Sequence, residues 1–279
     1  MLDVLLVALA LVPTGGPLSP AARAGYERAV ERARYQFVIG NTRPFDEVYP
    51  AFVFDQRVSR EMAEERVLRS AFGMTITPQV LSEEFDRIER STKAPDQWQA
   101  IQNALGNDRQ LVEDVFCRPL LVDRALRAKF AFDQKIHAAA HERARAARNA
   151  FLAGRSVPEA ATVALSRNAA PSPTTDELLA GARAQGSAPR ALSPLGNSDR
   201  GAPLAPEPEV AAVLEKKLRK PGDVSTILEE RDRFQVFRLT AIDADSWTTQ
   251  AVTYPKRDFD SWLNEQIREV SSGKPGKPK

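Results

Sequence analysis

Apolar residues recur every three or four positions through the first half of the chain, which is the spacing of amphipathic helices. After Ser59 they include Ala63, Val67 and Ala71, each four residues from the last. Serine is a good N-terminal cap, and glycine readily takes the left-handed conformation that ends helices. The pattern therefore predicts a helix that begins at Ser59 and ends at Gly73.

Three more amphipathic helices are predicted after this one, joined by tight turns. Thr77 and Pro78 form a start signal, because threonine caps a helix and proline suits its first turn. The next helix stops at Gly106, and the last begins near Asp108. Pro119 falls on the apolar face of the last helix and is expected to kink or interrupt it. In chain order, the predicted buried faces consist of Leu81, Phe85 and Ile88, then Trp98, Ile101 and Leu105, then Leu111, Val115, Val122 and Leu126.

The remaining segments carry weaker patterns. Aromatic and β-branched residues at Phe234–Leu239 predict a strand, and Ala251–Tyr254 is a second candidate. We expect helices over Val157–Ser166 and Pro255–Val270. Arg43–Phe54, which holds two prolines and several aromatic residues, is expected to be extended.

Composition allows a sizeable core and argues against a nucleic-acid partner. The chain has 279 residues, 43% of them hydrophobic, which suits one large domain or two modest ones. Its 39 basic and 37 acidic residues give a net charge of +2, without the strong positive field of a nucleic-acid binder. After the N-terminus no apolar stretch is long enough to span a membrane, so no span is expected in the mature chain.

The N-terminus resembles a secretory signal. Val4–Val12 is an apolar run, and Ala22–Ala24 (ARA) resembles a cleavage site. Asp3 departs from the pattern, since signals begin with a basic residue. We predict that residues 1–24 are a signal peptide and that the protein is exported, to the periplasm. The alternatives are a short buried helix or a start codon assigned a few residues late.

Four short motifs occur in order along the chain: ITPQVLSEEFDRI (Ile76–Ile88), FLAGRSVPEAATVALSRNA (Phe151–Ala169), LRKPGDVS with RFQVFRL (Leu218–Leu239), and FDSWLNEQIRE (Phe259–Glu269). Together they resemble the SurA-like peptidyl-prolyl isomerases. In that family the first motif belongs to a helical chaperone domain and the next two to a parvulin domain. The last motif is a C-terminal helix that packs back on the chaperone domain. The order of the motifs across 58–270 carries the resemblance, more than any one of them.

The resemblance implies an α+β fold with two domains. A mainly helical, SurA-like chaperone domain would cover 25–132 and be completed by 255–270. A small, divergent parvulin-like α/β domain would cover 133–245. Within it, residues 168–208 are rich in Pro, Ala, Gly and Ser, which indicates long loops or a partly disordered insert. The basic tail, 271–279, is expected to be disordered.

The sequence around Pro221 fits the end of such an α/β domain. Pro221 fixes its own φ, and Gly222 permits the reversed turn that stops the preceding helix. Val224 and Ile227 can then enter a sheet. Phe234–Leu239 would be the neighbouring strand, across a charged turn.

The resemblance also implies an active site built on two histidines on adjacent strands. The second of these falls on Gln235, which is not a histidine. His137 is the candidate for the first, although the alanines that follow it suit a helix better than a strand. Leu204 matches an apolar position that holds the proline ring, and Val210 replaces the family's phenylalanine. Whether the chain is an enzyme is therefore uncertain.

Neither the histidines nor the cysteine predicts a cofactor. His137 and His141 are four residues apart and would share a helix face, as in zinc sites, but no third ligand is evident. Two solvated histidines on a helix are the simpler interpretation. Cys117 is the one cysteine, so it cannot form an intramolecular disulfide, and it is expected to be a buried apolar residue. We predict no metal and no cofactor.

Four aromatic residues of the predicted helices have two interpretations. Phe72, Phe85, Trp98 and Trp262 can form the core of the helical domain, which is the commoner role of aromatics at helical spacing. Some of them can instead line a groove for extended, unfolded polypeptide. Both interpretations can hold for different residues.

The sequence leads to a function by resemblance. We expect an exported SurA-like chaperone that binds unfolded or extended polypeptide, with an inactive parvulin-like domain. The alternative is an active peptidyl-prolyl cis-trans isomerase with a divergent site. A scaffold without either activity is a third possibility, because long loops such as 168–208 often carry interaction sites.

Overall fold

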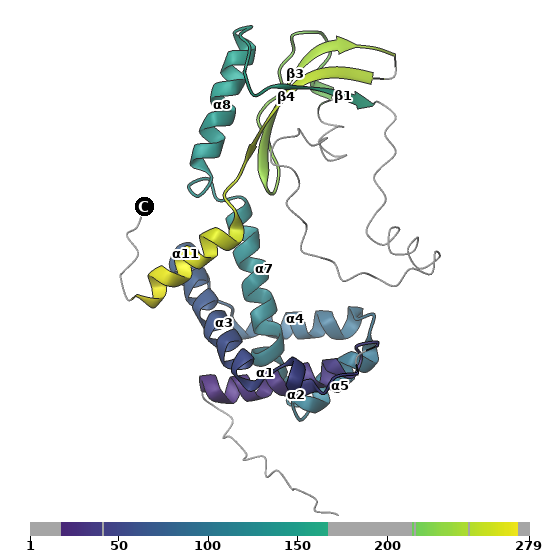
Figure 1. The fold of residues 1–279 in the computed structure, drawn as a ribbon, viewed down its shortest axis with the longest axis vertical. Helices are drawn as coiled ribbons and strands as arrows, with labels where there is room; N and C mark the ends of the chain where they lie inside the picture. Colours follow the sequence, from purple (N-terminus) through teal and green to yellow (C-terminus); the bar gives the residue numbers. More distant parts are fainter. Residues whose placement is uncertain (1–17, 41, 167–213, 215, 245, 273–279) are drawn as a thin grey trace, which may run out of the picture. The chain divides into compact units, whose positions relative to one another are not determined.

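The structure is a computed structural model that describes residues 18–40, 42–166, 214, 216–244 and 246–272. It confirms the α+β class: the described residues are mostly helical, with one four-stranded antiparallel sheet (Figure 1). The chain divides into two compact units. We call them the helical unit, described over 18–129 and 259–272, and the sheet unit, described between 130 and 258. None of the described helices is both long and apolar enough to cross a membrane.

The helical unit begins with α1 (Pro20–Tyr35), which contains the proposed cleavage motif at Ala22–Ala24. A short helix, α2 (Phe45–Val48), and a long one, α3 (Ala51–Phe72), follow. The prediction that Arg43–Phe54 is extended is therefore wrong. A proline immediately precedes each of these two helices, and its fixed φ and missing N–H suit a helix start.

Helix α3 begins well before Ser59, so the predicted cap there is also wrong. Ser59 lies inside the helix, and its hydroxyl donates to the Asp55 carbonyl oxygen at 2.7 Å. Serine makes this bond to the preceding turn when it sits within a helix. The predicted end of the helix is confirmed, because Gly73 caps it with φ 65°.

The next helices are α4 (Pro78–Ser91), α5 (Pro95–Ala104) and α6 (Arg109–Val112). The predicted cap at Thr77 and the predicted helix start near Asp108 are confirmed. Thr77 accepts a hydrogen bond from the Val80 N–H at 3.4 Å, and Asp108 accepts one from the Leu111 N–H at 3.1 Å.

Pro119 does not break the last of the predicted helices. A π-helical turn, η1 (Glu113–Cys117), joins α6 to α7 (Arg118–Ala131), and the Arg118 N–H donates to the Glu113 carbonyl five residues back. Proline cannot donate to the carbonyl four residues before it, and its ring crowds that carbonyl. The wider turn absorbs both effects, so the helix continues through Pro119.

The C-terminal helix α11 (Phe259–Ser271) belongs to the helical unit and packs on α3. The ring centroids of Phe72 and Trp262 lie 5.7 Å apart at this contact. The main core of the unit lies between the other helices and consists of Val30, Leu81, Phe85, Trp98, Ile101, Leu105, Val112, Val115 and Cys117.

The sheet unit contains α8 (Ala138–Leu152) and four antiparallel strands in the order β1-β4-β3-β2. Their bounds are Ala161–Ser166 for β1, Leu228–Glu229 for β2, Arg233–Ile242 for β3 and Ser246–Pro255 for β4. Both predicted strands are confirmed, as parts of β3 and β4. The predicted helix over Val157–Ser166 is wrong, because β1 occupies its second half and pairs with β4, far away in sequence.

Apolar side chains cover both faces of the sheet. Phe234, Val236, Val252 and Tyr254 pack against α8, and Phe237, Leu239, Trp247 and Ala251 pack against Leu214 and Leu218. The turn at Pro221 behaves as predicted: Gly222 has φ 97° and its N–H donates to the Leu239 carbonyl at 2.8 Å. Val224 then bridges to Arg238, and β2 forms a hairpin with β3.

Candidate functional site

His137, the candidate for the first catalytic histidine, precedes α8 and lies on no strand. Its side chain is buried, with 1% of its surface exposed, and both ring nitrogens are engaged. Nε2 donates to the Phe130 carbonyl at 2.7 Å, and Nδ1 accepts from the Arg257 N–H at 3.3 Å. Burial lowers the pKa of His137. The arrangement therefore holds a neutral imidazole as part of the packing, with neither nitrogen open to a substrate.

Gln235, at the family's second histidine position, lies on β3 and is fully buried. Its amide donates to the Thr253 hydroxyl on β4 at 3.1 Å. The strand pair that the resemblance implies is not formed, because only Gln235 of the two candidates lies on a strand. Leu204 and Val210, the other predicted site residues, lie outside the described residues.

The four predicted peptide-binding aromatics are mostly core residues. Phe85, Trp98 and Trp262 are each less than 7% exposed, and Phe72 is half-buried against Trp262. Trp98 differs from the others because it also lines a hollow in the surface of the helical unit. The structure thus brings Phe85 and Trp98 together, with ring centroids 5.4 Å apart, and leaves Phe72 and Trp262 at the separate contact with α11.

Two adjoining hollows lie between the helices of the helical unit. One, of about 110 Å³, lies between α1, α3 and the π turn. The other, of about 210 Å³, lies between α1, α4, α5 and the π turn. Arg34, Phe116 and Leu120 line both, so the two hollows share a wall. We call them together the helical groove.

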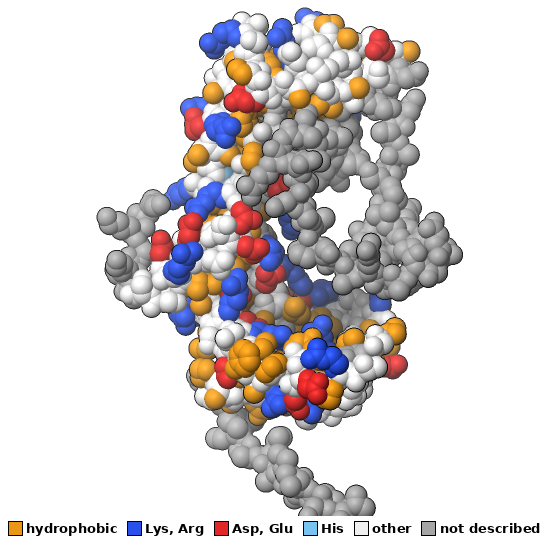
Figure 2. Space-filling view, in the orientation of Figure 1, with side chains coloured by type: hydrophobic (Ala, Val, Ile, Leu, Met, Phe, Trp, Pro, Cys, Tyr) orange, Lys and Arg blue, Asp and Glu red, His pale blue; other side chains and the backbone are white. Residues whose placement is uncertain are grey.

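The two hollows of the helical groove differ in the number of charged residues that line them. Arg34 is the charged residue in the lining of the larger hollow, where Ile88, Trp98 and Ile101 provide apolar surface. The smaller hollow has apolar walls as well, but five charged side chains also line it: Glu27, Glu31, Arg34, Arg57 and Glu61. Hydrophobic side chains gather near α1 and α2 among charges of both signs (Figure 2). The groove can therefore take an apolar side chain at one end and a polar or charged group at the other.

Sequence reasoning missed Phe116 and Leu120, which form the shared wall. Neither belongs to the face of Val115, Val122 and Leu126 that the spacing predicts to be buried. Phe116 is half-buried and Leu120 is 43% exposed. The sequence did contain an indication of this wall, because two apolar residues next to Pro119 lie outside the predicted buried face of the helix.

The remaining reactive side chains of the helical unit have structural roles. Cys117 is fully buried, and burial raises the pKa of its thiol to about 12, so it remains protonated and unreactive. Glu84 lies between Arg87 and Arg124, which hold the pKa of its carboxyl at about 2 and tie α4 to α7. Among the described residues, no three His, Cys, Asp or Glu side chains gather as a metal site would need.

Comparison with known proteins gives no relative from which a site could be transferred. The chain matches no protein-family model, no curated protein and no solved structure.

Proposed function

We propose that this chain is an exported, SurA-like chaperone that binds extended segments of unfolded polypeptide in the helical groove. The observation that carries the proposal is the pair of hollows that share Phe116 and Leu120. The motif order from Ile76 to Glu269 and the apolar run at Val4–Val12 support the family and the export.

Two adjoining hollows could receive successive side chains from one face of an extended client. In an extended chain, side chains two residues apart point the same way, about 6.5–7 Å from each other. One such side chain would enter the apolar hollow of about 210 Å³ and the next would face the smaller, charged hollow. Burial of one leucine-sized side chain contributes about 1.5–3 kcal/mol, which gives weak, sequence-tolerant binding. Weak and tolerant binding is what a chaperone needs in order to release its clients.

The sheet unit is proposed to be an inactive relative of the parvulin domain. Gln235 replaces one histidine of the family's pair, and His137 is held by Phe130 and Arg257 at the start of a helix. A parvulin-like unit without its site would then serve as a structural partner of the chaperone unit.

A matched pair of substitutions tests the groove. Leu120→Glu places a carboxylate in the shared wall, whereas Leu152→Glu makes the same change at a 56% exposed leucine of the sheet unit. Binding of a permanently unfolded model protein would be measured by fluorescence anisotropy. We expect Leu120→Glu to weaken binding at least about tenfold, because it desolvates a charge against the client, and Leu152→Glu to change it less than about twofold.

Two outcomes would count against the proposal. If the wild-type chain neither binds the unfolded protein nor suppresses its aggregation, the chaperone function is wrong. If both variants weaken binding equally, the chain binds polypeptide but the helical groove is not the site.

A further inference from the structure

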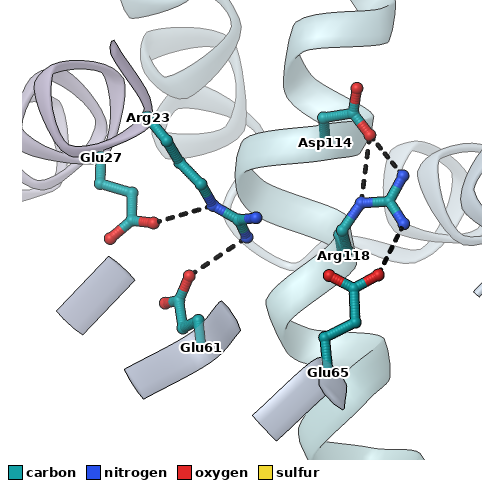
Figure 3. Close-up of polar contacts among 6 residues, drawn as sticks. All are labelled: Arg23, Glu27, Glu61, Glu65, Asp114 and Arg118. Carbon is teal, nitrogen blue, oxygen red and sulfur yellow. Dashed lines mark hydrogen bonds and ion pairs between the residues drawn. The ribbon is translucent and has the colours of Figure 1, made fainter. Parts of the chain in front are cut away.

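Glu27 and Glu61, which line the smaller hollow of the groove, form a largely buried trio of charged residues with Arg23 (Figure 3). Arg23 Nε lies 3.4 Å from Glu27 Oε1, and Arg23 Nη2 lies 3.2 Å from Glu61 Oε2. The side chains of Arg23, Glu27 and Glu61 are 11%, 6% and 17% exposed. Since Arg23 and Glu27 belong to α1 and Glu61 to α3, the trio joins these two helices.

The charges of this trio do not balance if both carboxyls are ionised. One guanidinium then serves two carboxylates, in a site with little access to water. No N–H or hydroxyl group of the described residues donates to Glu27 Oε2, which is buried. If one of the two carboxyl groups carried a proton, the trio would be neutral, and the protonated carboxyl could donate a hydrogen bond to the other.

Of the neighbouring arginines, Arg57 also acts on Glu61 through its charge, but neither Arg34 nor Arg57 forms an ion pair with Glu27 or Glu61 among the described contacts. Arg34 and Arg57 both contact Glu31, at 3.4 and 3.3 Å. In the described chain, the charged groups of α1, α3, η1 and α7 around the trio are Glu31, Arg34, Arg57, Glu65, Asp114 and Arg118.

A second trio beside the first shows the contrast (Figure 3). Arg118 donates twice to Asp114, at 2.6 and 3.2 Å, and once to Glu65, at 3.4 Å. Here the carboxylates are 33% and 25% exposed, so water can balance the second negative charge. The carboxylates of the first trio are less accessible to solvent, with Glu27 6% and Glu61 17% exposed.

We propose that Glu27 and Glu61 bind one proton between them, and that its release weakens the packing of α1 against α3. The proposal concerns the folded state of the helical unit and does not depend on the chaperone function.

The protonation energetics agree with this geometry. Burial, and then the hydrogen bond and negative charge of Glu27, raise the pKa of Glu61 to about 8, against partly opposing effects of the charges of Arg23 and Arg57. A carboxyl whose pKa is raised on folding contributes stability that is complete below its unfolded pKa and is lost as the pH rises through its folded pKa. The contribution of Glu61 should therefore fall between about pH 4.5 and pH 8.

Titration of the wild-type chain gives the direct test. With glutamate carboxyl carbons labelled with ¹³C, NMR should show one carboxyl that titrates near pH 8 and that disappears in Glu61→Gln. If every glutamate carboxyl of the wild-type chain titrates below about pH 6, the proposal is wrong, whether or not the variant folds.

Denaturant unfolding of the full chain gives the second test. The amide that Glu61→Gln introduces can donate to Glu27 at any pH, so this variant should lack the pH dependence that the carboxyl pair contributes. We expect the ratio of wild-type to variant folding constants to fall up to about tenfold per pH unit between the two pKa values, as release of one proton requires.

Glu65→Gln, one turn further along α3 in the more accessible second trio, is the matched control. The ratio of the wild-type folding constant to that of Glu65→Gln should change by less than about twofold over the same pH range. A ratio for Glu61→Gln as flat as that of the control would overturn the proposal.

Discussion

At the scale of single residues, His137, Gln235 and Lys256 of the sheet unit are each held by hydrogen bonds to protein partners, which gives them structural roles. His137 is bonded at both ring nitrogens, and Gln235 is tied to Thr253 across two strands. Lys256 is a deeply buried cation, with a side chain 1% exposed. Its Nζ donates to the Ala131 carbonyl at 2.6 Å and to Glu229 at 2.8 Å.

Lys256→Met should destabilise the protein by about 1–3 kcal/mol, because it keeps the chain length but leaves the Ala131 carbonyl without its donor. Most of the loss should come from that carbonyl, since Glu229 is 37% exposed and water can replace its partner. Denaturant unfolding measures the change. Lys217→Met, at an exposed position, is the control, and an equal effect of both changes would contradict the assigned role.

At the scale of elements, the ends of the helices are set by local chemistry. Thr77 and Asp108 cap helix starts through their own side chains, and Gly73 ends α3 in the left-handed conformation. A side chain at this glycine would meet open space, with nothing within 4 Å, so backbone conformation alone makes glycine necessary there. Gly25, inside α1, also has open space but ordinary helical φ.

Gly73→Ala and Gly25→Ala should therefore change stability in opposite directions. Alanine at position 73 must adopt φ near 65°, which costs about 1–2 kcal/mol. Alanine at position 25 should stabilise the protein by about 0.5–1 kcal/mol, because glycine is the poorer helix former. Thermal unfolding of both variants checks this. Stabilisation by Gly73→Ala would show that this cap does not hold α3's end.

At the scale of the whole molecule, the two units have different chemistry. The helical unit has hollows lined by apolar and charged residues, whereas the described catalytic candidates of the sheet unit are packed inside it. A histidine pair on adjacent strands cannot arise from His137 and His141, which lie at and within the start of α8.

We expect the full chain to leave the isomerisation rate of a proline-containing tetrapeptide at its uncatalysed value in a protease-coupled assay. Gln235→His should not raise that rate, because His137 would still be bonded to Phe130 and Arg257 at a helix start. A clear acceleration by the wild-type chain, lost in His137→Ala, would instead establish the alternative of an active isomerase.

Features that depend on neighbours within one or two turns could be predicted from the amino-acid sequence. The caps at Thr77 and Asp108, the end of α3 at Gly73, the turn at Gly222 and the strand from Phe234 were all predictable, because each rests on local hydrogen bonds, φ preferences or a short apolar pattern. The α+β class was predicted from the family resemblance, and the structure confirms it.

Features that need partners distant in the sequence could not be predicted and became visible in the tertiary structure. The prediction of a helix at β1 failed because the strand is held by pairing with β4, which its local sequence does not reveal. For example, the Thr249 hydroxyl of β4 donates to the Val163 carbonyl, 86 residues away in the sequence. The helical groove and the Glu27–Glu61 pair arise where α1, α3 and the π turn meet, and no periodicity along one helix encodes that meeting. Local chemistry sets where the elements begin and end, whereas packing between distant elements decides which side chains lose their water and which line a hollow.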